Sequence, residues 1–413
     1  MRKERLIVPV VMGLALAWAL AQYAASLLFE RELVRTLEDL EARGELVVER
    51  EEVERGWLSS SGRVRIAPLL GDAWQLQLTY TARHGVLSTR LEGELAPTLG
   101  PEQRRLFGDA LPSSPPQWHA RFRTLGATLE GSLRLAPFLV SQGERELDFQ
   151  GGQATFGGEQ GDWWLRARLE PLRLTDGVAT LEAGPSRLES RYAYTEGAYH
   201  FTQHDLLRLE RLAWRQPDLA LDGRELVYRS QMQLDDSELV IDGELNLGEV
   251  MAAEQVLLTG DVAAQFSRVD AEALRTLLRR LREEVMMAGS DPPTPRGLVA
   301  RLEPEFKALL ADSPRLDVTT VDLDSPMLGI AAQGEGTLIF DPRRLEELSV
   351  ARLDDPREQA QWRRRLDGDF VWREAPTVVA LWLGLPLETR ELEIDVVRGK
   401  VRVNGRPLPP LWR

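Results

Sequence analysis

The chain contains no cysteine among its 413 residues. This absence excludes disulfides, thiolate metal sites and cysteine nucleophiles, so packing and hydrogen bonding have to stabilise the fold. Basic residues are also in short supply: 51 lysines and arginines face 65 aspartates and glutamates, which leaves a net charge of −14. Because negative charge repels nucleic-acid phosphates, we do not expect a nucleic acid among the partners of this protein.

Familiar catalytic and cofactor-binding motifs are absent as well. Serines 59–61 lack the GxSxG pattern of a nucleophile elbow, and no glycine-rich phosphate loop opens a helix. His200 and His204 have the spacing of a zinc-binding pair, but neither a third ligand nor an HExxH pattern lies near them. We therefore expect no catalytic, cofactor-binding or metal-binding residues and predict that the protein is not an enzyme. An extracytoplasmic hydrolase is the enzymatic alternative.

Long hydrophobic runs occur only at the N-terminus. After a basic cluster in the first five residues, no charged residue occurs between Leu6 and Phe29. These 24 residues are long enough to cross a hydrocarbon core of about 30 Å as a helix. The positive charges before the run predict a cytoplasmic N-terminus, with the rest of the chain outside the cytoplasm. The sequence thus predicts a single-pass anchor in a bacterial inner membrane, with a periplasmic domain.

A cleaved signal peptide is the alternative reading of the same segment. Residues 19–21, Ala-Leu-Ala, offer a small-x-small cleavage site. The apolar run continues past this site to Phe29, beyond the usual end of a secretory signal, which favours retention. Leucines at 33, 37 and 40, interleaved with acidic residues, then predict a short helical stalk.

Period-two alternation of apolar and polar residues is the main pattern after the stalk. It recurs over residues 75–80, 129–135, 165–169, 226–232 and 239–247 and indicates strands with one apolar face. The dipeptides Asp176-Gly177, Glu196-Gly197, Asp222-Gly223 and Asp242-Gly243 predict tight turns between strands. Such short connections favour antiparallel neighbours. We therefore expect a long antiparallel meander.

Helical patterns return only in the last third of the chain. Asp270 is a suitable N-cap for a helix through residue 285, and a second helix is expected over residues 298–310. Shorter helices are expected at 342–348, 355–366 and 375–383, and strands at 316–323, 334–340 and in a hairpin through Arg398-Gly399.

These patterns predict a mainly β (α+β) fold. A transmembrane helix is followed by a long, curved antiparallel meander sheet with a few C-terminal helices packed on it. The expected parts are residues 1–29, tip and anchor; 30–45, stalk; 46–268, meander; and 269–413, a mixed α/β part completing the same sheet.

The excess of sheet over helix leads to the functional hypotheses. Every apolar sheet face has to be buried, either against itself, against helices or against a hydrophobic ligand. Tryptophans suit contact with acyl chains, although they are also common core residues. Trp57, Trp164 and Trp382 are the candidate groove residues. We expect either a binder of lipid or another hydrophobic ligand, or a structural module that binds envelope proteins through its sheet edges.

Three segments resemble a known bacterial family. Residues 55–62 (RGWLSSSG), 266–274 (FSRVDAEAL) and 399–409 (GKVRVNGRPLP) are similar in order and placement to segments of the YdgA-like family. The resemblance implies an inner-membrane, periplasm-facing protein of unknown function with no catalytic residues to transfer. It also implies a looser similarity to the AsmA-like envelope proteins, which are associated with lipid movement and outer-membrane biogenesis.

Overall fold

The computed structural model describes residues 4–42, 44–71, 73–100, 115–195, 200–288 and 294–408; the side chains of 4–15, 288 and 295 lie outside this description. In these parts of the chain, 23 strands belong to one antiparallel sheet, as the mainly β prediction required. Two compact units divide the chain. Unit 1 comprises Met1–Leu174 and Glu189–Ala198, and unit 2 comprises Thr175–Leu188 and Tyr199–Arg413.

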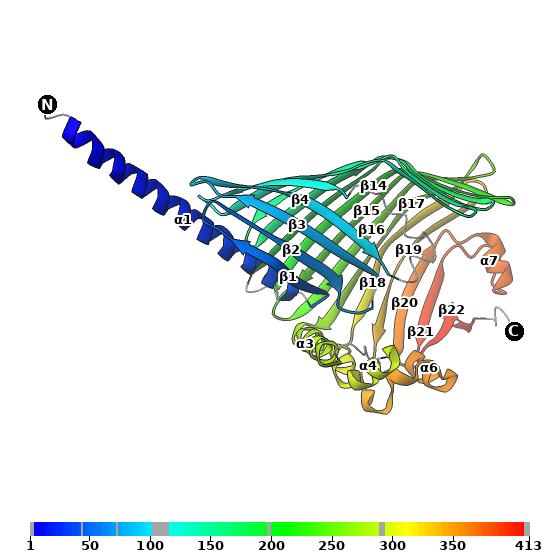
Figure 1. The fold of residues 1–413 in the computed structure, drawn as a ribbon. Coiled ribbons are helices and arrows are strands. Elements are labelled where there is room, and N and C mark those ends of the chain that lie inside the picture. The colour runs from blue at the N-terminus through cyan, green and yellow to red at the C-terminus, as the bar shows by residue number, and fades with distance from the viewer. Residues whose placement is uncertain are drawn as a thin grey trace. The chain divides into compact units, whose positions relative to one another are not determined.

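Unit 1 is an up-and-down meander beside one long helix (Figure 1). Strands β1 to β6 pair in chain order, β6 then pairs with β9, and β9 with β10, while β7 and β8 form a hairpin between them. Its elements are α1 (Glu4–Ala42), β1 (Leu46–Arg55), β2 (Ser59–Pro68), β3 (Trp74–Arg83), β4 (Ser88–Leu99), β5 (Gln117–Arg123), β6 (Thr128–Leu135), β7 (Phe138–Gln142), β8 (Arg145–Phe149), β9 (Gly152–Glu159) and β10 (Asp162–Leu169), with β11 (Leu172–Asp176) and β13 (Ser186–Thr195) at the sequence boundary with unit 2.

Helix α1 joins the predicted anchor and stalk in one continuous element. In its second half, Leu33 and Leu37 pack with Phe29 against the core of the sheet. The leucine period attributed to a stalk is therefore the sheet-facing stripe of an amphipathic helix. Among the helices with described side chains, none combines the length and apolar character needed to cross a bilayer. The first ten residues of the predicted anchor, 6–15, have side chains outside the described part.

The end of the predicted anchor is buried in protein. Ala25, Ser26 and Phe29 are all at most 5% exposed. The Gln22 amide donates a 2.8 Å hydrogen bond to the backbone oxygen of His84, just after β3. The helix thus reaches the sheet of unit 1 at about Gln22, seven residues earlier than the sequence pattern indicated. Hydropathy alone cannot separate lipid-facing from protein-facing apolar residues, because both environments favour the same side chains.

Unit 2 is a second antiparallel meander with unusually long strands. Its order of pairing is β12, β14, β15, β16, β17, β18, β19, β20, β21, β22 and β23. The strands are β12 (Ala179–Ala183), β14 (His200–Gln216), β15 (Leu219–Leu234), β16 (Glu238–Ala252), β17 (Gln255–Asp270), β18 (Arg315–Ser325), β19 (Ile330–Phe340), β20 (Leu366–Arg373), β21 (Leu392–Val397), β22 (Lys400–Val403) and β23 (Arg406–Pro407).

Two of the predicted turns are wrong. Asp222-Gly223 lies inside β15 and Asp242-Gly243 inside β16. Asp222 accepts hydrogen bonds from the Arg211 guanidinium of β14, the shortest at 2.6 Å. The carboxylate therefore has a hydrogen-bond partner on the neighbouring strand. The ladder also continues through Gly223 and Gly243. Asp176-Gly177 does lie between β11 and β12, as predicted, and Glu196-Gly197 lies outside the described residues.

Most of the helices expected in unit 2 form, but the segment 342–348 contains only a short 3₁₀ turn. They are α3 (Ala271–Ala288), α4 (Pro295–Arg301), α5 (Glu303–Leu309), α6 (Pro356–Arg363) and α7 (Thr377–Trp382), with 3₁₀ turns η1 (Leu345–Glu347) and η2 (Val350–Arg352). Asp270 caps α3 by accepting from the Ala273 amide, as expected. The helix expected over 298–310 is divided at Leu302. Pro304 follows this break, and a proline fits only the first turn of a new helix.

Candidate ligand-binding groove

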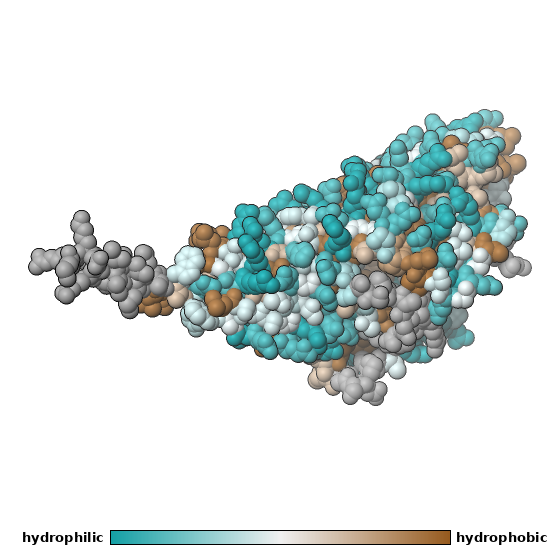
Figure 2. Space-filling model, turned by 45° about the horizontal axis from the view of Figure 1, so that its top comes forward, coloured by the Kyte–Doolittle hydropathy of each residue, from teal (hydrophilic) through white to brown (hydrophobic). Residues whose placement is uncertain are grey.

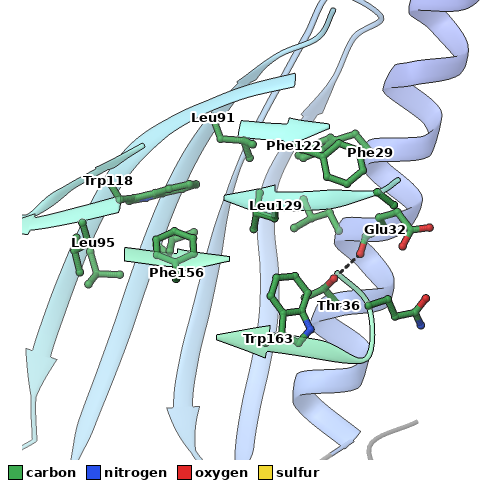
Figure 3. A pocket seen from close by; sticks show the side chains of 15 residues that line it. Phe29, Glu32, Thr36, Leu91, Leu95, Trp118, Phe122, Leu129, Phe156 and Trp163 are labelled. Atoms are coloured by element: carbon green, nitrogen blue, oxygen red, sulfur yellow. Dashed lines mark hydrogen bonds between the residues drawn. The ribbon is translucent and has the colours of Figure 1, made fainter. Parts of the chain in front are cut away.

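The inner face of unit 1 is shaped by aromatic residues that lie across from glycines. Trp118 of β5 pairs directly with Gly93 of β4, and Phe156 of β9 pairs with Gly131 of β6. A Cβ at Gly131 would lie 2.5 Å from the Phe156 ring, and one at Gly93 would lie 2.9 Å from Trp118 Nε1. The rings therefore occupy the space that a side chain would take and extend along the sheet (Figure 3). The inner face of the sheet is therefore apolar, and open space remains above it.

A cavity of about 300 Å³ fills this space between α1 and the sheet (Figure 3). Its lining is apolar apart from Glu32, Thr36 and Gln160. The other lining residues are Phe29 and Leu33 from the helix and Leu78, Leu91, Leu95, Trp118, Phe122, Ala127, Leu129, Leu133, Phe156 and Trp163 from the sheet side.

A second cavity of about 270 Å³ adjoins the first, because both are lined by Thr36, Phe156 and Trp163. It continues past Leu40 of the helix to Tyr194 of β13. We call the two cavities together the groove. The helix residues that line it extend from Phe29 to Leu40, about 17 Å at a rise of about 1.5 Å per residue.

A buried charged contact holds the helix against the sheet beside the groove. Arg50 Nη2 of β1 lies 2.9 Å from Glu30 Oε2 of α1, with the two side chains only 12% and 15% exposed. Arg50 Nε donates to the Tyr80 hydroxyl at 3.1 Å. Burial lowers the pKa of Arg50, but the hydrogen bonds with Tyr80 and Glu30 outweigh burial and leave that pKa above its ordinary value. Separating the two partners would leave a buried charge without its counter-ion, which is strongly destabilising. This contact therefore fixes where α1 crosses the sheet.

A second polar contact holds the helix at the far end of the groove. The Tyr194 hydroxyl donates a 2.6 Å hydrogen bond to Asp39 Oδ2 of α1. Burial, together with this bond to a carboxylate, raises the pKa of Tyr194 to about 12. The phenol therefore stays protonated and remains a donor at any physiological pH.

His84 connects the entry point of the helix to the sheet. Its imidazole contacts Ser60 Oγ at 3.1 Å and Thr89 Oγ1 at 3.2 Å, and its ring lies 5.3 Å from the Phe29 ring. Burial lowers the pKa of His84 below the ordinary value of 6.5, although Glu30 opposes this. The neutral imidazole is thus the form that fits the folded protein.

Acidification is therefore expected to destabilise unit 1 through His84. The unfolded chain binds a proton near pH 6.5 and the folded chain only at lower pH. Stability should thus be complete above about pH 6.5 and fall as the pH drops below that value. Denaturant titrations between pH 7.5 and 5.5 measure this fall, and His84→Gln should reduce it. An identical pH dependence in His84→Gln and the natural protein would contradict the assignment.

The three predicted groove tryptophans lie in different places. Trp164 borders the second cavity, but its indole lies over Gly157 on β9, with the Arg166 guanidinium 5.0 Å from its ring. Side chains alternate along a strand, and the neighbouring Trp163 is the tryptophan that lines both cavities. Trp57 is half-exposed between β1 and β2, and Trp382 is half-exposed at the end of α7 in unit 2. Neither lines the groove.

Unit 2 carries a broader apolar surface on its long strands. One row runs across β14, β15 and β16, where Leu207, Tyr228 and Leu245 are paired in turn. A second row on β17 and β18 consists of Phe266 paired with Leu316. These five side chains are 36–43% exposed. On the same unit, His200 Nε2 lies 2.6 Å from Asp236 Oδ1. No group of three or more His, Asp or Glu residues suited to a metal occurs within the described residues.

Comparison with known proteins gives one match. The model of a family described as "Bacterial protein of unknown function (DUF945)" matches residues 1–361. No curated protein and no solved structure matches the chain. The expected YdgA-like and AsmA-like relationships are not part of that description and stay predictions.

Proposed function

The chain belongs to this bacterial family of unknown function, DUF945, and from that premise we propose that it is a non-enzymatic, membrane-anchored envelope protein that binds one acyl chain in the groove. The observation that carries the proposal is the pair of adjoining apolar cavities between α1 and the sheet. Their volumes fall at the lower end of the range for small-molecule sites, which are mostly apolar with a few polar groups.

The dimensions of the groove favour a slender ligand. The helix residues along it cover about 17 Å, and half of a hydrocarbon core of about 30 Å, the length of one acyl chain, is about 15 Å. The aromatic rings that lie over glycines give the groove an apolar surface, so an acyl chain bound along it would bury apolar area. Gln160 and the Glu32 carboxylate offer polar contacts to a headgroup.

The placement at a membrane is also part of the proposal. The charge-free N-terminal run that starts at Leu6, preceded by basic residues, supports a single-pass inner-membrane anchor with the two units in the periplasm. A domain tethered this closely to lipid would exchange acyl chains with the bilayer over a short distance. Envelope maintenance is the role that follows from such an exchange.

Thr36 offers the sharpest test, because it lines both cavities. Thr36→Phe adds a ring where the cavities meet and occupies space that an acyl chain would need. We expect roughly a tenfold loss of bound acyl chains, which corresponds to about 1.4 kcal/mol of binding free energy. The full-length protein is purified in mild detergent and its co-purifying lipids are quantified by mass spectrometry.

Thr36→Val is the matched control. It keeps the size of the side chain and removes only the hydroxyl that donates to the Glu32 backbone oxygen at 2.8 Å. This variant should retain lipid at the level of the natural protein. Equal lipid content in the natural protein, Thr36→Phe and a single-helix membrane protein purified in parallel would contradict groove binding. That result would favour the tethered interaction module.

A further inference from the structure

The end of unit 1 where α1 enters carries a row of exposed apolar turns. Leu58 of the β1–β2 turn, Leu87 of the β3–β4 turn and Leu125 of the β5–β6 turn are 52%, 68% and 78% exposed. Backbone hydrogen bonds place the turns side by side, because the His84 amide donates to the Leu58 oxygen and the Thr124 amide to the Leu87 oxygen. We call these three turns the rim.

Arginines stand directly behind the rim. The strands β1, β3 and β5, which lead into the three turns, end at Arg55, Arg83 and Arg123. Their side chains are 57–72% exposed, and each forms an ion pair with a glutamate: Glu30, Glu92 and Glu130 respectively. Apolar tips backed by exposed arginines, which can exchange these glutamates for phosphates, match the order of a lipid leaflet, in which the phosphates lie outside the hydrocarbon. Scattered surface leucines would not repeat this order on three successive hairpins.

The helix gives a second, independent reason. Gln22 is bonded to the rim at His84, so only residues 6–21 of the apolar run lie before the helix reaches unit 1. Sixteen residues cover about 24 Å, which is less than a hydrocarbon core of about 30 Å. Hydrophobic side chains also gather where the grey N-terminal part meets the described part in Figure 2. Contact of the rim with the bilayer brings the start of this short helix closer to the far side of the hydrocarbon core and so reduces the mismatch.

We propose that the rim docks into the surface of a phospholipid bilayer, with Leu58, Leu87 and Leu125 in the acyl region and the three arginines at the lipid phosphates. This inference rests on the membrane anchoring in the proposed function and not on ligand binding in the groove. It places the Phe29 end of the groove next to the leaflet, because Phe29 contacts His84 and lines the first cavity.

The absence of cysteine allows a direct test. Single-cysteine variants Leu87→Cys and Leu125→Cys of the full-length chain are labelled with an environment-sensitive nitrobenzoxadiazole dye and reconstituted into vesicles of phosphatidylethanolamine and phosphatidylglycerol. We expect blue-shifted emission that shallow doxyl-labelled lipids quench and aqueous iodide does not. Leu70→Cys is the matched control, since Leu70 is 51% exposed in the β2–β3 connection at the opposite end of the strands. Its label should respond to iodide alone.

A label at Leu16→Cys, on the exposed part of α1, distinguishes a failure of rim docking from a failure of membrane anchoring. Quenching of this label by lipid, with labels at 87 and 125 quenched only by iodide, would overturn rim docking and leave the anchor intact. Labels at 87 and 125 that are protected from both quenchers would indicate a protein partner or a second copy and also overturn it. Failure of lipid to quench the label at 16 would overturn the anchor itself.

Discussion

Replacing Phe29 by alanine is expected to lower the free energy of unfolding of unit 1 by about 3–5 kcal/mol, as for other buried aromatic residues. The Phe29 side chain is 3% exposed and lies in the main core cluster of the unit. Its ring lies 5.3 Å from His84 and packs edge-on against Phe122 at 5.7 Å. No other aromatic ring among the described residues of α1 is buried, so the substitution removes the largest buried apolar contact between the helix and the sheet.

Denaturant unfolding of the full-length protein, followed by near-ultraviolet circular dichroism, measures this change. Leu27→Ala is the control on the same helix, because Leu27 is 52% exposed and should lose less than about 0.5 kcal/mol. Equal destabilisation by the two substitutions would contradict the packing of α1 on unit 1.

Replacing Gly93 by alanine is expected to prevent unit 1 from folding. A Cβ there would lie 1.9 Å from the Thr79 backbone oxygen, far inside any permitted contact. Trp118 Nε1 donates to this same oxygen at 3.2 Å, so a shift of β3 also breaks the bond that orients the groove tryptophan. Losses above about 4 kcal/mol arise from few mechanisms, of which a forced core displacement is one.

The readout for Gly93→Ala is resistance to proteolysis after expression of the full-length chain, with fragments mapped by mass spectrometry. Cleavage within residues 44–171 is expected. Gly243→Ala serves as the control: its nearest neighbour would be the Tyr228 hydroxyl at 3.9 Å, so a strand glycine is replaced without a clash. An intact and equally resistant Gly93→Ala protein would contradict the close packing of β3, β4 and Trp118.

Much of the fold could be predicted from the sequence, because most of the sheet follows local rules. The alternation at residues 75–80 and 129–135 gives strands β3 and β6, and Asp270 caps α3 as predicted. The helix expected from residue 355 also forms, with Asp355 as its N-cap. The hairpin through Arg398-Gly399 also forms as predicted, between β21 and β22. In these segments the conformation that the local sequence favours is also the one that the folded protein requires.

Other features depend on neighbours that are distant in sequence. Asp222-Gly223 has the composition of a turn, yet Arg211 on the adjacent strand supplies a partner for the carboxylate inside the ladder. The groove depends on Gly93 and Gly131 lying opposite Trp118 and Phe156, and strand register cannot be read from composition. For the same reason, recognising Trp163 rather than Trp164 as the tryptophan that lines both cavities required the register of β10 on β9.

The central claim is that the groove holds an acyl chain, and photo-crosslinking in living cells tests it most directly. Cells expressing the full-length protein incorporate a fatty acid that carries a diazirine near its methyl end, and crosslinked peptides are mapped after irradiation. Our account predicts adducts on α1 between Phe29 and Leu40 and on β9 and β10 near Phe156 and Trp163. These adducts should disappear in Thr36→Phe and persist in Thr36→Val. Adducts confined to residues before Gln22, with none in the groove, would contradict it.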